Sequence, residues 1–414
     1  DSETRYGFLM NDAICIVGGG QAGLSIASKL RKLGDQRPIT IISSELYPPY
    51  QRPPLSKKYL LGDTKKERLF FRPLDWYQGN NVSLKLGATV KSINRENKTV
   101  QLETGEIFAY QKLALTTGSN AIKLPKKLGG LLSGVYSIKT LNDVDNIKHE
   151  FMAGKTMLVI GGGYIGLEAA ATANKLGLNV VLVEKENRIL NRVAAVATAD
   201  YFRNLHLSKG VQILESTSLV NLIEKGGRLA GARLSSGETI SVDFVVCGIG
   251  IRPNDDLAEK AELKVSNGIN VNEYCQTSDK DIVAAGDCAS FLYKDKLIRL
   301  ESVQNAIDQG EIAAETIFGN KVSYQPYPWF WSDQFETKLQ IAGLNIGFNH
   351  TIVRKGRRPG GQSVWYYRDQ SLIAVDAMND GSTYLVVSRL LKMQTNVTPE
   401  QADNINFDLK SLLK

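Results

Sequence analysis

The chain is poor in the residues on which several classes of site depend. Of its 414 residues, 4 are cysteines and 3 are histidines. The cysteines stand singly, with no C-x-x-C pair, at Cys15, Cys247, Cys275 and Cys288. This spacing argues against a disulfide scaffold, a thiolate zinc site and a redox-active dithiol, and we expect no metal site. The histidines lie in no motif, and we expect them to be ordinary surface or core residues: His149, His206 and His350.

Long apolar runs are also missing. No stretch approaches the length that spans a bilayer, and residues 1–9 lack the apolar core of a signal peptide. We therefore expect a cytoplasmic protein without membrane contact. Met10 could be the natural start, and the sequence leaves this open.

The remaining composition is that of a soluble globular protein. Hydrophobic residues make up 43% and charged residues 22%, in a chain long enough for two or three domains. The formal net charge of +7 favours acidic partners. The densest basic cluster, Arg354 to Arg358, is typical of a solvated loop and is also a candidate for partner binding.

A strand–turn–helix pattern opens the chain. The apolar run from Ile14 to Val17 is followed by Gly18, Gly20 and Gly23 and then by a helical pattern. In such a unit the first glycine turns the chain, the second lets the backbone approach a pyrophosphate, and the third lets the helix pack on the strand. The stretch predicts a dinucleotide site, with the N–H groups of the helix start facing the phosphates.

The next strand, residues 39–42, leads to two candidates for the adenosine ribose. The fold usually places an acidic residue about twenty positions beyond the glycines, and this chain has Ser44 and Glu45 there. Either Glu45 takes the role from one position further on, or Ser44 makes a neutral hydrogen bond to the ribose.

A proline-rich stretch, residues 48–57, follows. It is too rigid to be helical before Pro54, and we expect a helix from Leu55 onward because proline is well tolerated at the first helical position. The stretch would hold Arg52 and Lys57 beside the nucleotide, or serve only as a stiff connection.

Later stretches are rich in strand patterns. Residues 82–93 alternate apolar and polar, and residues 99–106 have the pattern of a strand and turn, which together predict a small antiparallel layer. Residues 112–118 predict a buried strand of the first sheet. Residues 281–289 predict a strand that delivers Asp287 at a glycine turn, where its carboxylate either accepts hydrogen bonds from a ribityl chain or caps a helix.

The opening pattern recurs at residues 157–168, with its own glycines at Gly161, Gly163 and Gly166. Its second strand ends in Glu184, which suits a ribose diol and repels a 2′-phosphate, so NADH is preferred over NADPH. Two such repeats predict an α/β protein with two Rossmann-type domains, followed by an α+β domain from residue 327. A nicotinamide stacked on a flavin is the cofactor pairing that supports hydride transfer, which indicates a flavoprotein oxidoreductase.

Eight motifs also occur together in one order: Gly18–Gly23, Arg52–Lys57, Thr116–Gly118, Gly161–Glu168, Gly248–Asn254, Ala285–Ala289, Glu301–Ala306 and Trp329–Gln334. With this set the chain resembles the oxygenase-coupled NADH-dependent ferredoxin reductases. The resemblance implies a glutathione-reductase-like fold. Its parts are a discontinuous FAD domain (residues 11–120 and 248–326), an inserted NADH domain (121–247) and a C-terminal domain (327–414).

The resemblance also implies the site residues. FAD would be held by Gly18, Gly20, Ala22, Gly23, Ser44, Glu45, Arg52, Pro53, Lys57, Val90, Thr117, Gly118, Lys139, Asp287, Val303 and Trp331. NADH would be held by Gly161, Gly163, Ile165, Gly166 and Glu184. The chain departs from the family at two of these positions: Ser44 replaces a common Asp or Glu, and Lys139 a common Arg.

Glu168 has two interpretations. Its place two residues after Gly166 suggests the first helical turn, where the helix dipole favours a carboxylate. By resemblance it instead faces Lys57 across the isoalloxazine, with the lysine near the flavin N5, where a cation stabilises the reduced anionic flavin. We expect these two residues to be the catalytic ones.

The activity implied is hydride transfer from NADH to FAD, then two single-electron steps to an acidic [2Fe–2S] ferredoxin that serves a monooxygenase or dioxygenase. Disulfide reductases of this fold need a cysteine pair beside the flavin, and this chain has none. The positive charge suits a transient, steered encounter, and the expected docking surface uses Lys58, Arg72, Lys338 and the Arg354 to Arg358 cluster. We expect a monomer or weak dimer.

Three alternatives remain open from the sequence. Rubredoxin reductases and monodehydroascorbate reductases share much of the motif set. A flavoprotein like apoptosis-inducing factor would act as an NADH-gated binding protein. Its basic surface would suggest nucleic acid, but this chain has no dense basic tail, and we expect no nucleic-acid partner.

Overall fold

The computed structural model describes residues 12–414, so Met10 and residue 11, the expected start of the first domain, lie outside the described residues. The described chain forms two compact units. The first contains residues 12–51, 66–120 and 251–326, and the second contains residues 52–65, 121–250 and 327–414. The division into three functional domains remains a prediction.

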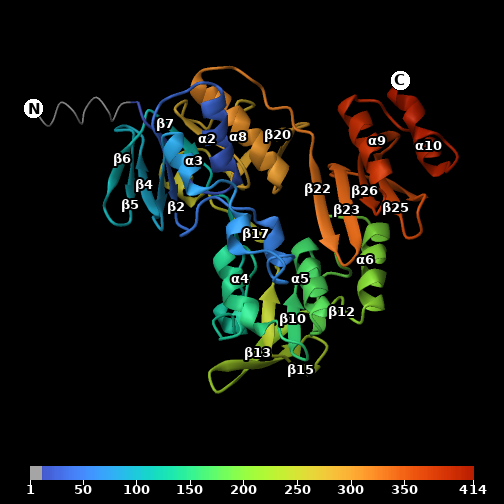
Figure 1. The fold of residues 1–414 in the computed structure, drawn as a ribbon. Coiled ribbons are helices and arrows are strands. Elements are labelled where there is room, and N and C mark those ends of the chain that lie inside the picture. The colour runs from blue at the N-terminus through green and yellow to red at the C-terminus, as the bar shows by residue number, and fades with distance from the viewer. Residues whose placement is uncertain (1–11) are drawn as a thin grey trace, which may run out of the picture. The chain divides into compact units, whose positions relative to one another are not determined.

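A five-stranded parallel sheet forms the core of the first unit, in the order β19-β7-β1-β2-β3. Its strands are β1 (Ile14–Val17), β2 (Ile39–Ser43), β3 (Val82–Leu86), β7 (Lys112–Leu115) and β19 (Ile282–Ala284). Helices α2 (Gln21–Lys32) and α8 (Val303–Phe318) pack against each other beside this sheet, as Figure 1 shows. The order of β3, β2 and β1 is that of a Rossmann fold, which confirms the strand–turn–helix prediction.

The antiparallel layer of this unit is smaller than predicted. It contains β4 (Val90–Asn94), β5 (Thr99–Leu102) and β6 (Ile107–Ala109). The first half of the alternating stretch, β3, instead pairs in parallel with β2, and its Val82 is buried in the core beneath α2. Alternation alone could not reveal this, because it shows that one face is buried and not which strand lies alongside.

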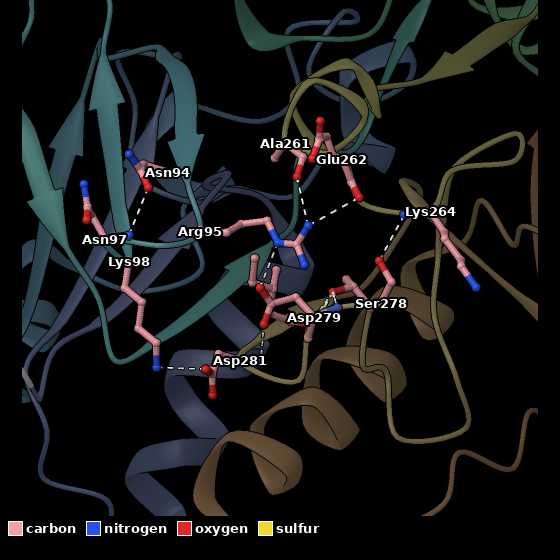
Figure 2. A network of polar contacts seen from close by, with 12 residues as sticks. Asn94, Arg95, Asn97, Lys98, Ala261, Glu262, Lys264, Ser278, Asp279 and Asp281 are labelled. Atoms are coloured by element: carbon pink, nitrogen blue, oxygen red, sulfur yellow. Dashed lines mark hydrogen bonds and ion pairs between the residues drawn. The ribbon is translucent and has the colours of Figure 1, made fainter.

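A polar network ties this layer to the strand that precedes Asp287 (Figure 2). The Arg95 guanidinium donates to Asp279 and to the carbonyl oxygens of Ala261 and Glu262, at 2.9, 3.2 and 3.4 Å. Asp281, directly before β19, forms ion pairs with Lys98 at 2.8 Å and with Lys112 at 2.7 Å. The entry to β19 is therefore held by the turn between β4 and β5 and by β7.

The remaining elements of the first unit are short. They are α3 (Leu74–Gly79), α7 (Asp256–Lys260), β17 (Ile251–Pro253), β18 (Ile269–Asn270), β20 (Ala289–Tyr293), β21 (Lys296–Ile298) and the 3₁₀ turn η2 (Lys66–Leu69). Strand β8 (Ser119–Ala121) contains the point in the sequence where the first unit ends, at Asn120, and the second resumes, at Ala121.

The second unit repeats the parallel sheet, in the order β12-β11-β10-β16-β9. Its strands are β9 (Val135–Tyr136), β10 (Thr156–Ile160), β11 (Asn179–Val183), β12 (Gln212–Leu214) and β16 (Phe244–Cys247). The helices are α4 (Leu141–Ile147), α5 (Tyr164–Lys175) and α6 (Val196–Ser208), and an antiparallel sheet holds β13 (Leu219–Lys225), β14 (Arg228–Leu234) and β15 (Thr239–Ser241). The predicted second Rossmann-type domain is confirmed.

An antiparallel five-stranded sheet completes the second unit, in the order β22-β23-β26-β25-β24. It contains β22 (Trp329–Gln334), β23 (Thr337–Gly343), β24 (His350–Lys355), β25 (Gln362–Arg368) and β26 (Ser371–Met378). Helix α9 (Gly381–Lys392) covers it, followed by α10 (Pro399–Asp403) and the 3₁₀ turn η5 (Leu409–Leu413) (Figure 1). Fully buried Trp365 and Leu390 join sheet and helix in one core, which confirms the predicted α+β domain.

None of the helices formed by residues 12–414 has both the length and the apolar character needed to cross a bilayer.

Candidate functional site

The first glycine turn has the geometry of an anion-binding loop. Gly18 has φ +114°, and a Cβ there would lie 1.9 Å from the backbone oxygen of Thr116. A Cβ on Gly20 would meet no atom within 4 Å. Gly20 is the N-cap of α2, and within the described chain no side chain caps this end and no acidic residue occupies its first turn. The first N–H groups of α2 are therefore placed to bind a phosphate.

Other expected FAD residues of the first unit gather around this loop. Gly286 lies so close to α2 that a Cβ on it would be 3.1 Å from the Cβ of Ala22. The Ser119 hydroxyl donates to Asp287 at 3.1 Å. Asp287 lies in a turn, and strand β20 (not a helix) begins two residues later at Ala289, so the alternative that Asp287 caps a helix is wrong.

Asn254 fixes the small-residue turn after β7. The Thr117 hydroxyl donates to the Asn254 carbonyl at 2.6 Å, and the Asn254 amide returns a bond to the Thr117 carbonyl at 2.9 Å. The backbone N–H of Asn254 donates to Gly118 at 2.9 Å. Of the remaining expected residues in this unit, Val90 begins β4 and Val303 begins α8, whose N-cap is Ser302.

The strand register adds a candidate for the ribose contact that the sequence reasoning missed. Val17 pairs with Ile42 in the first sheet, as Ile160 pairs with Val183 in the second. Ser43 is therefore the counterpart of Glu184, one position before Ser44. The Glu45 carboxylate accepts a hydrogen bond from the Tyr50 hydroxyl at 2.5 Å. The choice between Ser44 and Glu45 remains a prediction.

The second glycine turn repeats the first. Gly161 has φ +107°, and a Cβ there would lie 2.1 Å from the Gly248 oxygen, while one on Gly163 would meet nothing within 4 Å. The Glu184 carboxylate accepts from the N–H of Gly162 and of Glu186, both at 2.8 Å. Two backbone donors thus hold a carboxylate at the edge of this turn, where a ribose diol would bind.

The other expected NADH residues lie at the start of α5. Ile165 is 46% exposed beside the turn. Gly166 packs on the strand–turn backbone, since a Cβ on it would be 2.3 Å from the Gly161 oxygen.

Lys57 and Glu168 form a partly buried ion pair within the second unit. Lys57 Nζ lies 3.3 Å from Glu168 Oε1 and 3.5 Å from Asp333 Oδ2. The Ser56 hydroxyl donates to Glu168 Oε2 at 3.2 Å, and the Ser332 hydroxyl donates to Oε1 at 2.9 Å. Burial raises the pKa of Glu168, and Lys57 with the two serines opposes that rise.

The position of Glu168 in its helix corrects one interpretation. Helix α5 begins at Tyr164, so Glu168 is its fifth residue, and the first turn contains no acidic residue. The helix dipole acts mainly within the first turn. The dipole therefore does not account for this carboxylate, because Lys57 and the serines are its partners.

The proline-rich segment is a 3₁₀ turn, η1 (Pro53–Ser56), and not the start of a helix at Leu55. It ends at Lys57, whose φ of −128° and ψ of −110° are not helical. Both prolines occupy the first two positions of this turn, where the N–H groups of a helix have no intrahelical partner. Arg52, just before it, donates to the Lys139 carbonyl at 3.2 Å.

Trp331 lies in β22, where its ring stacks on Trp329 with centroids 5.2 Å apart and planes at 29°. The two polar residues that follow it, Ser332 and Asp333, were not predicted as site residues, although both contact the Lys57–Glu168 pair. Alternation in the Trp329–Gln334 motif was the available signal, because it puts Ser332 and Gln334 on one face.

The basic cluster is only in part a surface feature. Arg357 and Arg358 are exposed, but Arg354 donates to the backbone oxygens of five residues in the C-terminal segment at 3.0–3.3 Å. These residues are Gln401, Ala402, Asn404, Ile405 and Phe407. Arg354 is thus a structural clamp on that segment, and Arg357 and Arg358 are the exposed arginines of the cluster.

We expect Arg354→Met to lower the stability of the C-terminal segment by about 2–3 kcal/mol, because charged hydrogen bonds are lost and partly buried carbonyls are left unpaired. Hydrogen exchange of residues 399–413 measures this. Arg357→Met is the matched control and should stay within about 0.5 kcal/mol of the parent. Equal exchange in the two variants would contradict the clamp.

All four cysteines are free and buried. Burial raises the pKa of the Cys15 and Cys247 thiols to about 12. Cys15 and Cys247 pack as small residues in the hydrophobic cores of their units. In the part of the chain that the structure describes, no group of three or more His, Cys, Asp or Glu side chains could hold a metal ion.

Comparison with known proteins covers nearly the whole chain. The family described as pyridine nucleotide-disulphide oxidoreductase matches residues 12–310, and the reductase C-terminal family matches residues 329–413. Rhodocoxin reductase of Rhodococcus erythropolis is 38% identical over 96% of this chain and 93% of its own. A rubredoxin-NAD(+) reductase of Pseudomonas putida is 36% identical over 89% of this chain and 96% of its own.

A solved structure is also similar over nearly its full length. The chain matches a structure of the covalent putidaredoxin reductase–putidaredoxin complex with a TM-score of 0.94 and 35% identity, covering 97% of this chain and 98% of that one.

Proposed function

The chain belongs to the pyridine nucleotide-disulphide oxidoreductase family. We propose which of its residues bind the cofactors and which assist electron transfer in a ferredoxin reductase. The protein is a flavoprotein oxidoreductase that transfers electrons from NADH to the ferredoxin of an oxygenase system. The observation that carries this conclusion is the match along both the nucleotide-binding halves and the reductase C-terminal part.

The residues fit the two cofactors that the family implies. Each glycine turn leaves open space where a side chain would otherwise stand, and each is followed by a helix start uncapped by any described side chain. In this proposal FAD is held by the turn at Gly18–Gly23, by Asp287 and Thr117, and by the remaining FAD residues that the family resemblance implies. The turn at Gly161–Gly166 with Glu184 holds NADH. A cytoplasmic location and the three-domain division belong to the same proposal.

The flavin, when bound, supplies the chemistry that takes up a hydride and releases single electrons. Lys57 contributes a positive charge, and Glu168 and Asp333 fix the ammonium group in place. No described cysteine is paired or exposed. The electrons therefore pass to an outside acceptor, and no protein dithiol is part of the route.

We expect Glu184→Ala to lower kcat/KM for NADH by about 10–100-fold, because charged hydrogen bonds to a ribose diol would be lost. The preference over NADPH should shrink as well, since the repulsion of a 2′-phosphate is removed. Steady-state kinetics with both nucleotides measures this. Glu186→Ala removes a carboxylate two residues away and serves as control. An unchanged preference in Glu184→Ala would contradict the assignment.

The acceptor is proposed to be an acidic [2Fe–2S] ferredoxin, bound transiently. The net charge of +7 supports this, and the exposed Lys58, Lys338, Arg357 and Arg358 are candidates for contact. Arg72 is also exposed, although its guanidinium lies over the Trp76 ring at 5.7 Å. A monomer or weak dimer is part of the proposal.

The similarity to a rubredoxin reductase keeps rubredoxin as a second candidate acceptor. Steady-state assays should compare a [2Fe–2S] ferredoxin, a rubredoxin and the ascorbate radical, each with NADH. We expect the highest kcat/KM with ferredoxin, and a fall in that value as salt rises, because exposed charges are screened. Faster turnover of rubredoxin would overturn the assignment, and a rate independent of salt would overturn the steering.

A further inference from the structure

A chain of buried polar groups runs from α6 to the carboxylate of Glu168, entirely within the second unit. His206 Nε2 lies 2.8 Å from Gln334 Oε1. Gln334 Nε2 donates to the Ser332 hydroxyl oxygen at 3.2 Å, and that hydroxyl donates to Glu168 Oε1 at 2.9 Å. His206, Gln334 and Ser332 are 0% exposed, and Glu168 is 7% exposed. Solvent therefore does not interrupt the chain.

Two arrangements of protons run in a single direction through all three bonds of this chain. In the first, His206 donates from Nε2, Gln334 donates from its amide, Ser332 donates from its hydroxyl, and Glu168 is ionised. In the second, every bond is reversed: Glu168 is protonated on Oε1 and donates to Ser332, the Gln334 amide is rotated so that its N–H faces His206, and His206 carries its proton on Nδ1. A proton on Oε1 of Glu168 is thus coupled to the tautomer of a histidine on another helix.

The surroundings of His206 favour the first arrangement. Its Nδ1 is buried and has no hydrogen-bond partner among residues 12–414. The second arrangement would place an N–H at that position, and a buried donor without an acceptor is rarer than an unsatisfied acceptor. Burial also lowers the pKa of His206 to about 4, so the ring is neutral and one tautomer must be chosen.

The turn between β22 and β23 holds this end of the chain in place. The Phe335 ring meets the His206 ring edge-on with centroids 5.0 Å apart. Lys209 pairs with Glu336 at 3.4 Å, and Lys175 donates to the Phe335 carbonyl at 3.4 Å. Both lysines come from the ends of helices of the Rossmann-type domain, so the turn is anchored to α5 and α6.

We propose that Ser332, Gln334 and His206 are positioning residues, which hold Glu168 as a carboxylate directed at Lys57. The charged groups around Glu168 are few: Lys57, which follows η1, and Asp333, which lies on β22 and pairs with Lys57. Ser56 supplies the only other hydrogen bond to Glu168 that the described residues show. The role of this pair in flavin reduction rests on the proposed function, but the state of the carboxyl group does not.

The test is an infrared titration of the FAD-loaded protein, which distinguishes a carboxylic acid from a carboxylate. The band that disappears in Glu168→Gln identifies the group. We expect Ser332→Ala and Gln334→Leu to bind the Glu168 proton about tenfold more tightly than the parent, because a hydrogen bond to the charged form is lost or weakened. Ser363→Ala is the matched control, since it removes another buried serine hydroxyl of the same sheet, which accepts from Trp365.

Two variants of His206 test the hydrogen-bond chain without a substitution beside the carboxyl group. His206→Leu removes the donor to Gln334 and should shift the titration in the same direction, whereas His206→Gln keeps an N–H donor and should restore it. A Glu168 titration in Ser332→Ala and His206→Leu that matches the parent and Ser363→Ala would overturn the proposal. That result would leave the proposed function intact. The proposed function instead fails if substitutions at Lys57 and Glu168 do not slow flavin reduction.

Discussion

Lys57→Met is expected to slow reduction of the bound flavin by NADH by about 10²-fold, the usual cost of removing one preorganised electrostatic group. The methionine keeps the length and apolar stem of the side chain and removes only its charge. Stopped-flow absorbance separates the reduction rate from NADH binding, and we expect the rate, and not the binding, to change.

The design of this experiment includes two further variants. Lys65→Met removes an exposed lysine of the same segment and should reduce the flavin at the parent rate. Lys57→Met/Glu168→Gln should be little slower than Lys57→Met alone, because the two residues act as a pair and their effects are not additive. Additive losses would show that Glu168 acts independently of Lys57.

Gly18→Ala should destabilise the first unit by more than about 3 kcal/mol, and Gly20→Ala should leave its stability nearly unchanged. The difference follows from geometry. A Cβ on Gly18 would overlap the Thr116 backbone at a positive φ, whereas one on Gly20 enters open space at a φ of −97°.

The same two variants should also differ in how their substitutions affect FAD binding. Gly20→Ala is expected to fold but to lose FAD, since its methyl group would occupy the path of the pyrophosphate. Chemical denaturation of the FAD-free protein and flavin content after purification measure the two effects. Normal flavin content in Gly20→Ala would show that the pyrophosphate does not lie over this turn.

The sequence was sufficient for the parts of the fold that depend on local pattern. Glycine spacing between an apolar strand and a helix predicted both Rossmann-type sheets, and Glu184 was a clear candidate because it directly follows its strand. At the end of β2, Ser43, Ser44 and Glu45 follow one another, so the local pattern does not show which of them matches Glu184. Only the strand register reveals that Ser43 is the counterpart of Glu184.

The errors have a common physical origin in contacts between distant parts of the chain. The partners of Glu168 come from residues 112 and 164 positions away, so helix position alone suggested the dipole as a cause. His206 is in no motif, and its bond to Gln334 spans 128 residues. The five carbonyl partners of Arg354 likewise belong to a segment about 50 residues later, which a count of local charge does not reveal.

The buried cysteines offer a natural probe of how the enzyme opens. A thiol that is buried and protonated reacts with alkylating reagents only when its surroundings unfold. Cys15, Cys275 and Cys288 lie in the first unit and Cys247 lies in the second. Mass spectrometry of labelled peptides would therefore report, without any engineered tag, which unit unfolds first and how strongly each cofactor protects its own half.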